Sequence, residues 1–509
     1  MKRQILICSL LCAAMGYAQN PSDNYIRKKV YTTEDGTQFM QTTDYYSGIG
    51  DKVETVEKGA SGSGGDLVYM YDYDMLGRNI RSWLPFPNTG GGNSVDLSYG
   101  KATCGDFYNN SIAYSETEYE SSVPGRTLSQ SGPGVEWNGK KVTSGYKTNE
   151  SSGVYSCALY KTGSGGITKS GNYAAGSLYV TEVRDEDGNQ SYSFTDKAGQ
   201  TVLTRSTVSS GVYADTYYIY DDFGLLRYVL PPEASAAMGG NATYSDSHTA
   251  VADFAYIYTY DDRQQRKTAK LPGAAEVYFI YDKGGRLALK QDGVQKASNQ
   301  WVYYKYDAVS RVIEEGIYTT TTSRPALEGS FSVTYAPETL LTTGTVWLKK
   351  YYYDTYGIVS GNANFAYTAK SGYGTRHEYR VEGTDISTRN MLCAEEEKVL
   401  GLDTEKVLTT VWYYDDKGRV VQEIRTNIMG GYDKTYTAYT FTGLPSETLQ
   451  EHTALDKEPV TERYRFVYDN MQRIKQKYYR LNSDAEILLQ ECAYDANGRL
   501  TSDGNRGIT

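Results

Sequence analysis

Only three histidines are available to act as a general base or a metal ligand. His248, His377 and His452 each lie in a polar stretch with no second histidine nearby. Catalysis or metal binding by any of them would need partner residues from distant parts of the chain. The sequence contains neither a Gly-x-Ser-x-Gly elbow nor a His-Glu-x-x-His motif. It therefore predicts surface polar roles for the histidines and predicts that the protein is not an enzyme; a hydrolase that uses one of them is the alternative.

Acidic turns and glycine-rich loops could instead hold a cation or a phosphate. The run Asp185-Glu186-Asp187-Gly188-Asn189 offers oxygen ligands for Ca²⁺, but its spacing falls short of an EF-hand loop. The glycine-rich stretches 62–65, 90–92 and 163–166 are not followed by Lys-Ser or Lys-Thr and a helix, as a phosphate-binding loop would require. These segments are predicted to be solvated loops, and neither a metal nor a cofactor is predicted.

Cysteine chemistry is limited by spacing. Two of the six cysteines fall within the first 18 residues, and the other four are Cys104, Cys157, Cys393 and Cys492. They lie too far apart in the sequence for a metal site or a dense disulfide framework. One or two disulfides, of unspecified pairing, and four unpaired thiols both remain open at this stage.

Aspartate recurs within one repeated sequence motif. The pattern Tyr-Asp-x-x-Gly-Arg occurs four times in full. Its residues are Tyr73, Asp74, Gly77 and Arg78; Tyr281, Asp282, Gly285 and Arg286; Tyr414, Asp415, Gly418 and Arg419; and Tyr494, Asp495, Gly498 and Arg499. Shorter matches begin at Tyr220, Tyr260, Tyr306, Tyr353 and Tyr468, and Thr195–Gln200 is a further variant. The closest starts are 21 to 26 residues apart, so longer gaps are expected to hold hidden repeats or insertions.

Each match has the local sequence features of a β-hairpin. An aromatic strand such as Val277–Tyr281 precedes the turn, and a short return strand such as Arg286–Lys290 follows it. Asp opens the turn by accepting hydrogen bonds from backbone amides ahead of it, and Gly takes a left-handed conformation. Arg can then lie over the Tyr ring of its own or a neighbouring repeat, a contact of roughly 0.5–2 kcal/mol. Turn formation, rather than acid–base chemistry, is the predicted role of these aspartates.

Composition agrees with a strand-rich fold. Tyr and Gly are present 51 times each, whereas Phe is present 11 times and Pro 12 times. Tyr favours strands and keeps a wet hydroxyl on an apolar ring, and Gly is common in turns. Such a chain suits hairpins with one half-wet face, and exposed tyrosines are also common where proteins bind carbohydrate or other proteins.

The tandem motif resembles the YD-repeat, or RHS-repeat, family over roughly residues 65–90 and 180–509. In that family the hairpins wind into a long spiral sheet that encloses a hollow shell, often around the chain's own C-terminal cargo, as in bacterial polymorphic toxins, toxin-complex subunits and teneurins. The resemblance implies an all-β fold in which tandem β-hairpin repeats form a curved or spiral antiparallel sheet, part of an RHS/YD shell. Residues 24–87 also resemble the region that precedes such repeats in secreted bacterial proteins.

The first residues have the features of a secretory signal. Lys2 and Arg3 form a basic head, an apolar stretch follows, and cleavage is expected after Ala18. The apolar stretch is too short to span a bilayer, so the mature chain is expected to be secreted or held at the cell surface without spanning the membrane. Loss of the two basic residues takes the formal net charge from -10 to -12, which disfavours nucleic-acid partners.

Four regions are expected along the chain. They are a signal peptide at 1–18, an N-terminal β region at 19–90 that leads into the first repeat, an irregular Gly/Ser-rich β region at 91–180 that could cap or plug a sheet, and the repeat array at 181–509. Residues 394–400 are expected to form the only helical turn of any length. Toxin-type relatives continue after the repeats into a core segment with a self-cleaving aspartate site and then a toxic domain. This sequence stops soon after Arg499, so a truncated or partner-completed array is expected.

These features favour a non-enzymatic structural role. The leading hypothesis is part of an exported shell that presents or encloses an effector, encoded C-terminally or separately. The alternative is a cell-surface adhesin or carbohydrate-binding module that uses exposed tyrosines to bind a surface glycan or protein.

Overall fold

The computed structural model describes residues 24–375, 388–401 and 405–505. The expected signal peptide with its cleavage site after Ala18 lies outside these residues, and so does His377. Strands dominate, and the prediction of an all-β fold of antiparallel hairpins is confirmed. Among the described residues, thirty strands belong to the main antiparallel sheet, and β10, β11 and β17 form a separate small sheet. The chain has two compact units: unit 1 (Met1–Gly139, Tyr353–Ala394 and Leu408–Thr509) and unit 2 (Lys140–Tyr352 and Glu395–Val407).

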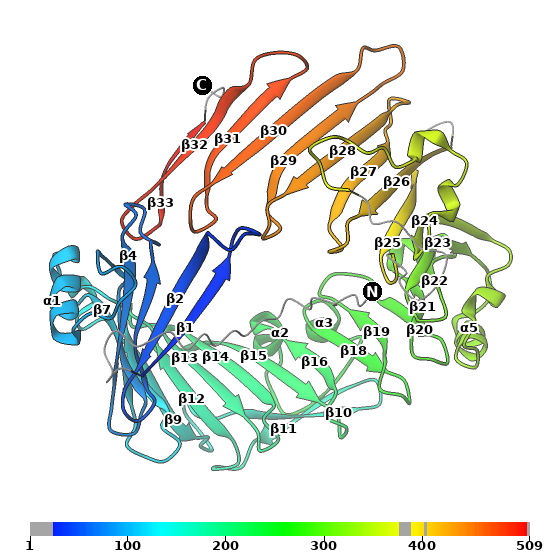
Figure 1. Cartoon of the computed structure of the whole chain (residues 1–509). Coiled ribbons are helices and arrows are strands. Elements are labelled where there is room, and N and C mark those ends of the chain that lie inside the picture. Colours follow the sequence, from blue (N-terminus) through cyan, green and yellow to red (C-terminus); the bar gives the residue numbers. More distant parts are fainter. Residues whose placement is uncertain (1–23, 376–387, 402–404, 506–509) are drawn as a thin grey trace. The chain divides into compact units, whose positions relative to one another are not determined.

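Unit 1 combines the N-terminal strands with the C-terminal hairpins of the chain, where β26 to β33 pair antiparallel in chain order (Figure 1). Its elements are β1 Asn24–Tyr31, β2 Phe39–Tyr46, β3 Lys52–Lys58, β4 Asp66–Tyr73, β5 Asn79–Trp83, β6 Phe86–Asn88, α1 Leu97–Tyr108, β7 Tyr114–Tyr119, β8 Thr127–Ser131, η1 Val135–Trp137, η3 Gly357–Val359, η4 Ala363–Phe365, β26 Lys406–Tyr414, β27 Val420–Thr426, β28 Tyr432–Tyr439, β29 Pro445–His452, β30 Val460–Tyr468, β31 Ile474–Leu481, β32 Ile487–Tyr494 and β33 Leu500–Asn505.

Unit 2 holds the middle of the array. Its elements are β9 Val142–Thr148, β10 Ala158–Gly163, β11 Gly166–Asn172, β12 Tyr179–Arg184, β13 Gln190–Thr195, β14 Thr201–Ser209, β15 Val212–Tyr220, β16 Leu226–Leu230, α2 Pro232–Ala237, β17 Thr243–Ser245, α3 Thr249–Ala252, β18 Tyr256–Tyr260, β19 Arg266–Lys270, β20 Val277–Tyr281, β21 Leu287–Gln291, α4 Gly293–Ala297, β22 Gln300–Tyr306, β23 Val312–Thr319, α5 Arg324–Phe331, η2 Pro337–Leu340, β24 Thr345–Tyr353 and most of β25 Leu392–Val399.

Apolar cores form where a short helix covers one face of the sheet. In unit 1, α1 packs on β4 and β6, where Met70, Phe86 and Cys104 are fully buried. A Cβ at Gly100 of α1 would overlap the end of the Met70 side chain, so the glycine lets that side chain pack directly against the helix. In unit 2, Phe331 of α5 is buried in a core with residues of β20 to β22. Burial of one such side chain contributes about 1.5–3 kcal/mol.

The expected helical turn at residues 394–400 is wrong. Residues Leu392–Val399 form strand β25, in which Cys393 and Ala394 are buried. Pairing in a sheet supplies every residue with backbone hydrogen bonds and side-chain contacts, and this outweighs the small helix preference of the Glu-rich run. Helices instead occur at other places, such as α1 within the region expected to be irregular β structure. No helix in the described part of the chain is long and apolar enough to cross a membrane.

Candidate functional site: the hairpin turns and a tyrosine-lined pocket

The turn Asp415–Arg419 shows what the repeated aspartate does. Its Oδ1 accepts the backbone N–H groups of Lys417 and Arg419, both at 2.9 Å. Its Oδ2 accepts Nε and Nη2 of Arg419, both at 2.7 Å. Gly418 has φ +75 and donates its N–H to the Asp415 carbonyl, which closes the turn, and the strand register shifts at Tyr414. This is a hairpin turn followed by a glycine bulge, and it uses both oxygens of the carboxylate.

The other three complete motifs have the same geometry. Asp74, Asp282 and Asp495 each accept the backbone N–H and the guanidinium of the arginine four residues later. The hydrogen bonds from Arg78 hold the pKa of Asp74 below its ordinary value, with the backbone amide of Arg78 as the largest cause. The glycines of these turns, Gly77, Gly285 and Gly498, all have positive φ. These carboxylates are therefore fully used in holding their turns.

Four of the motif arginines, Arg78, Arg286, Arg419 and Arg473, lie over a tyrosine of the next repeat. The Arg286 guanidinium is 4.8 Å from the ring centroid of Tyr306, and the Arg419 guanidinium is 4.5 Å from that of Tyr439. The same contact joins Arg78 to Tyr119 at 4.8 Å and Arg473 to Tyr494 at 4.5 Å. Neighbouring turns are thus coupled through cation–π contacts.

The tyrosine hydroxyls couple the repeats a second time. In ten of the described repeats the motif tyrosine donates its hydroxyl to the carbonyl of the residue that follows the arginine position of the preceding turn, and we call this contact the tyrosine staple. The ten pairs are Tyr73–Lys52, Tyr119–Asn79, Tyr220–Thr201, Tyr260–Leu226, Tyr281–Arg266, Tyr306–Leu287, Tyr414–Leu392, Tyr439–Val420, Tyr468–Pro445 and Tyr494–Ile474, at 2.6 to 3.2 Å. The staple requires a phenol at this position, which explains why these ten positions hold Tyr rather than Phe.

Two of these repeats were missed by the sequence analysis. Tyr119 begins a longer turn in which Glu120 replaces Asp and accepts the Arg126 guanidinium at 2.8 and 2.9 Å. Tyr439 begins a turn in which the Thr440 hydroxyl replaces the carboxylate and accepts the N–H of Leu444. A search for Tyr followed by any short polar acceptor and a later Gly would have found both.

The acidic turn at Asp185 is another copy rather than a calcium loop. Asp185 Oδ1 accepts the backbone amides of Asp187 and Asn189, and its Oδ2 accepts Asn189 Nδ2 at 2.8 Å. Asn189 therefore stands where other repeats have Arg. In the described parts of the chain, no cluster of three or more His, Cys, Asp or Glu residues could hold a metal ion.

One turn has been opened by a long insertion. Asp354 donates its N–H to Met391 and accepts the N–H of Asn390 on Oδ1 at 2.6 Å, as Asp and the end of the motif do elsewhere. Between them, the described residues 355–375 form an inserted segment that lies against strands β26 to β29 of unit 1 (Figure 1). Its Thr368 N–H donates to Gln422, and its Lys370 pairs with Glu451. The gap that suggested an insertion in the sequence thus contains one.

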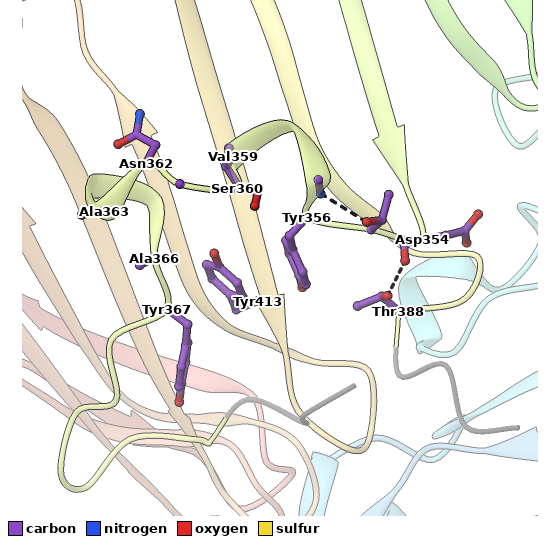
Figure 2. Close-up of a pocket in the computed structure, with 13 residues that line it drawn as sticks. Asp354, Tyr356, Val359, Ser360, Asn362, Ala363, Ala366, Tyr367, Thr388 and Tyr413 are labelled. Atoms are coloured by element: carbon purple, nitrogen blue, oxygen red, sulfur yellow. Dashed lines mark hydrogen bonds between the residues drawn. The ribbon is translucent and has the colours of Figure 1, made fainter. Parts of the chain in front are cut away.

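A cavity of about 900 Å³ lies beneath this inserted segment (Figure 2). Its aromatic lining consists of Tyr356, Tyr367 and Tyr413. The Tyr356 and Tyr413 rings stack with centroids 4.6 Å apart, and Tyr367 is tilted toward Tyr413 at 5.5 Å. Thr388 and Asn362 add polar groups to the wall, and none of the lining residues is a cation. Such a surface suits a neutral ligand with a flat apolar face and several hydroxyls.

Comparison with known proteins gives two kinds of match. A family model described as "Domain of unknown function (DUF6443)" matches residues 19–150. The sequence matches no curated protein. Among solved structures, the chain is similar to one in "Crystal Structure of TcdB2-TccC3" (TM-score 0.45, 12% identity, covering 94% of this chain and 23% of that one). A chain of the Photorhabdus luminescens Tc holotoxin pore is similar at TM-score 0.44 and 13% identity, with 94% and 22% covered. This chain spans less than a quarter of the length of those chains.

The described histidines have local partners. His248 Nδ1 accepts the N–H of Ala250 at the start of α3, and its ring lies edge-on to Tyr244. His452 Nδ1 is 2.5 Å from a carboxylate oxygen of Asp433 on the paired strand. The two histidines therefore belong to different units, and His248 caps the N-terminus of helix α3.

The four cysteines are unpaired and buried. This resolves the choice left open by the sequence in favour of free thiols. Burial raises the pKa of Cys104 to about 11 and that of Cys157 to about 12. A thiol with such a pKa is almost wholly protonated at neutral pH, so these two are packing residues rather than nucleophiles.

Proposed function

We propose that this chain is an exported YD/RHS-repeat protein whose hairpin array is a structural wall that presents or encloses a toxin-like effector. The observation that carries the proposal is the tyrosine staple, repeated ten times with one geometry. In every staple, the tyrosine hydroxyl, which could otherwise bind a ligand, joins one repeat to the next. The array is therefore specialised for its own assembly.

The charges of the turns support the same role. In the four complete motifs the aspartate and the arginine neutralise each other, and Arg78, Arg286 and Arg419 also contact an aromatic ring. Strand β30 continues this pattern, because its Arg463 pairs with Glu447 of β29 and its Arg465 pairs with Glu486, just before β32. A wall with paired charges holds few groups that would bind a cargo irreversibly.

Export is supported by the basic head and apolar stretch of the first 18 residues. The effector is supported by the family resemblance of the tandem motif. The proposed partner is a protein domain, encoded in the same reading frame or beside it, that occupies the space bounded by the array.

Electron microscopy and small-angle scattering of the secreted product of the complete reading frame test this proposal. The expected particle is hollow, with a wall one sheet thick and an interior domain that resists added protease until the wall is unfolded. A solid particle, or an effector domain cut as fast as it is when free, would contradict enclosure.

The tyrosine-lined pocket favours a second candidate function, the binding of a neutral surface glycan. The half-buried Tyr356 and Tyr367 rings and the polar wall suit a pyranose, which offers an apolar face and hydroxyls, while the buried Tyr413 ring stacks against Tyr356. Glycan-array binding by the whole chain should be lost in Tyr367→Ala and kept in Tyr179→Ala, since Tyr179 is 63% exposed but lies outside the pocket. Silence across a broad array, or equal loss in both variants, would count against this candidate.

A further inference from the structure

A loop of the N-terminal region makes specific contacts with the last described turn of the array, and both belong to unit 1. The loop between β3 and β4, residues 59–65, meets the turn Asp495–Arg499. Gly62 donates its N–H to the Asp495 carbonyl at 3.0 Å. The Ala60 carbonyl accepts Nη1 of Arg473 at 3.1 Å, across 413 residues of sequence. A third contact comes from the end of α1, where the Tyr108 hydroxyl accepts Nδ2 of Asn497 at 2.8 Å.

The loop is shaped for this contact. A Cβ at Gly62 would collide with the backbone carbonyls of Tyr494 and Asp495, and a Cβ at Gly498 would lie 3.2 Å from the Ala60 carbonyl. The loop therefore needs glycine at position 62, and Gly498 on the turn is closely packed against it. Only glycine allows two backbones to approach so closely.

The first residues of the loop are buried and held in place, whereas Gly62, Ser63 and Gly64 at its tip are exposed. Ala60 and Ser61 are each only 2% exposed. Asp66, itself buried, accepts the N–H of Gly59 at 2.9 Å and that of Gly92 at 2.5 Å, so one carboxylate fixes the loop from two sides. A binding surface that is held in place before its partner arrives loses little entropy on binding.

We propose that the N-terminal region, which matches the domain of unknown function, is a receptor for a YD turn. Loop 59–65 and Tyr108 recognise three features of that turn: the carbonyl of its aspartate, the side chain at its third position and a close-packed glycine. The occupant here is the turn Asp495–Arg499, together with the arginine of the preceding repeat. The receptor thus holds the hairpin β32–β33 against the N-terminal strands and gives the region a binding function of its own.

Native-state hydrogen exchange on the whole chain tests the receptor. Gly62→Val should raise amide exchange in β32 and β33 at least about tenfold, because it breaks several hydrogen bonds at once. Exchange in β26 and β27 should stay unchanged. Gly48→Val is the matched control, since Gly48 lies in the neighbouring hairpin loop and a Cβ there meets nothing within 4 Å. Unchanged exchange in β32 and β33 of Gly62→Val would overturn the proposal.

A double-mutant cycle keeps the test decisive if the valine variant folds poorly. Tyr108→Phe and Asn497→Ala remove the two sides of the Asn497–Tyr108 hydrogen bond, and Tyr108→Phe also removes the bond from the Tyr108 hydroxyl to the Pro85 carbonyl. Because the cycle isolates the shared bond, the double variant should raise exchange in β32 by two- to tenfold less than the product of the single effects. Lys417→Ala, at the same turn position as Asn497 but in the turn of β26 and β27, should show no coupling to Tyr108→Phe. Strictly multiplicative effects of Tyr108→Phe and Asn497→Ala would refute the receptor.

Discussion

Replacing Asp415 tests whether the motif carboxylate holds its turn as the contacts indicate. Asp415→Ala removes two hydrogen bonds from backbone amides to Oδ1, worth about 1 kcal/mol each. It also removes the charge-assisted pair between Oδ2 and Arg419, worth about 1.5–3 kcal/mol. The expected loss in local opening free energy is therefore about 3–5 kcal/mol. Asp415→Asn keeps the Oδ1 acceptor and loses only the pair, so its expected loss is about half of that.

The assay is native-state hydrogen exchange of the amides in β26 and β27, because a chain of many hairpins need not unfold in a single transition. Asp416→Ala is the matched control, since the exposed Asp416 lies in the same turn and its removal should change the opening free energy by less than about 0.5 kcal/mol. If Asp415→Ala behaved like Asp416→Ala, or if the Asn variant lost as much as the Ala variant, the assigned division of labour between the two carboxylate oxygens would be wrong.

Three further predictions follow from contacts in the turns and cores. Tyr439→Phe removes one staple and should raise exchange in β27 and β28 about fivefold, a loss of about 1 kcal/mol; no change would show that the ring alone matters. Cys104 and Cys157, with pKa values raised to about 11 and about 12, should resist a thiol reagent at pH 8 until the chain unfolds, and rapid labelling of native protein would contradict their burial. Burial raises the pKa of Glu447, but hydrogen bonds, chiefly from Arg463, outweigh it and the pKa is lowered from 4.5. The stability from this pair should therefore be complete at neutral pH and lost as the pH falls below about 4.5. The melting temperature should fall less over this pH range in Arg463→Met than in the unmodified chain.

The hairpin turns were predictable because their chemistry is local. Asp, Gly and Arg lie within five residues of one another, so their types and spacing alone indicate a turn with a left-handed glycine. The structure adds that the left-handed position survives even where the glycine is lost, as at Gln264 (φ +63), Ser310 (φ +69) and Gln472 (φ +61). Such residues cost about 1–2 kcal/mol there, which the intact carboxylate contacts offset.

The contacts between repeats were harder to predict because their partners lie at variable distances in the sequence. The staple acceptor is a backbone carbonyl, which carries no residue type, so Tyr439 gives no sign of Val420 as its partner. The inserted segment after Asp354 was visible only as a long gap, and its path across β26 to β29 depends on side chains that it meets in the folded state. The helix prediction for residues 394–400 was wrong for the same reason, since the strand pairing that decides their structure cannot be seen in the local sequence.

The tyrosine staple has a mechanical consequence. Each staple fastens the tip of one hairpin to its neighbour, so tension applied to the two ends of the array would load one staple at a time. Each rupture between closely spaced repeats would release 21 to 26 residues, which extend by roughly 80 Å when fully stretched, and a rupture across a longer gap would release more. The chain should therefore lengthen under force in a series of steps and yield gradually instead of breaking at one point.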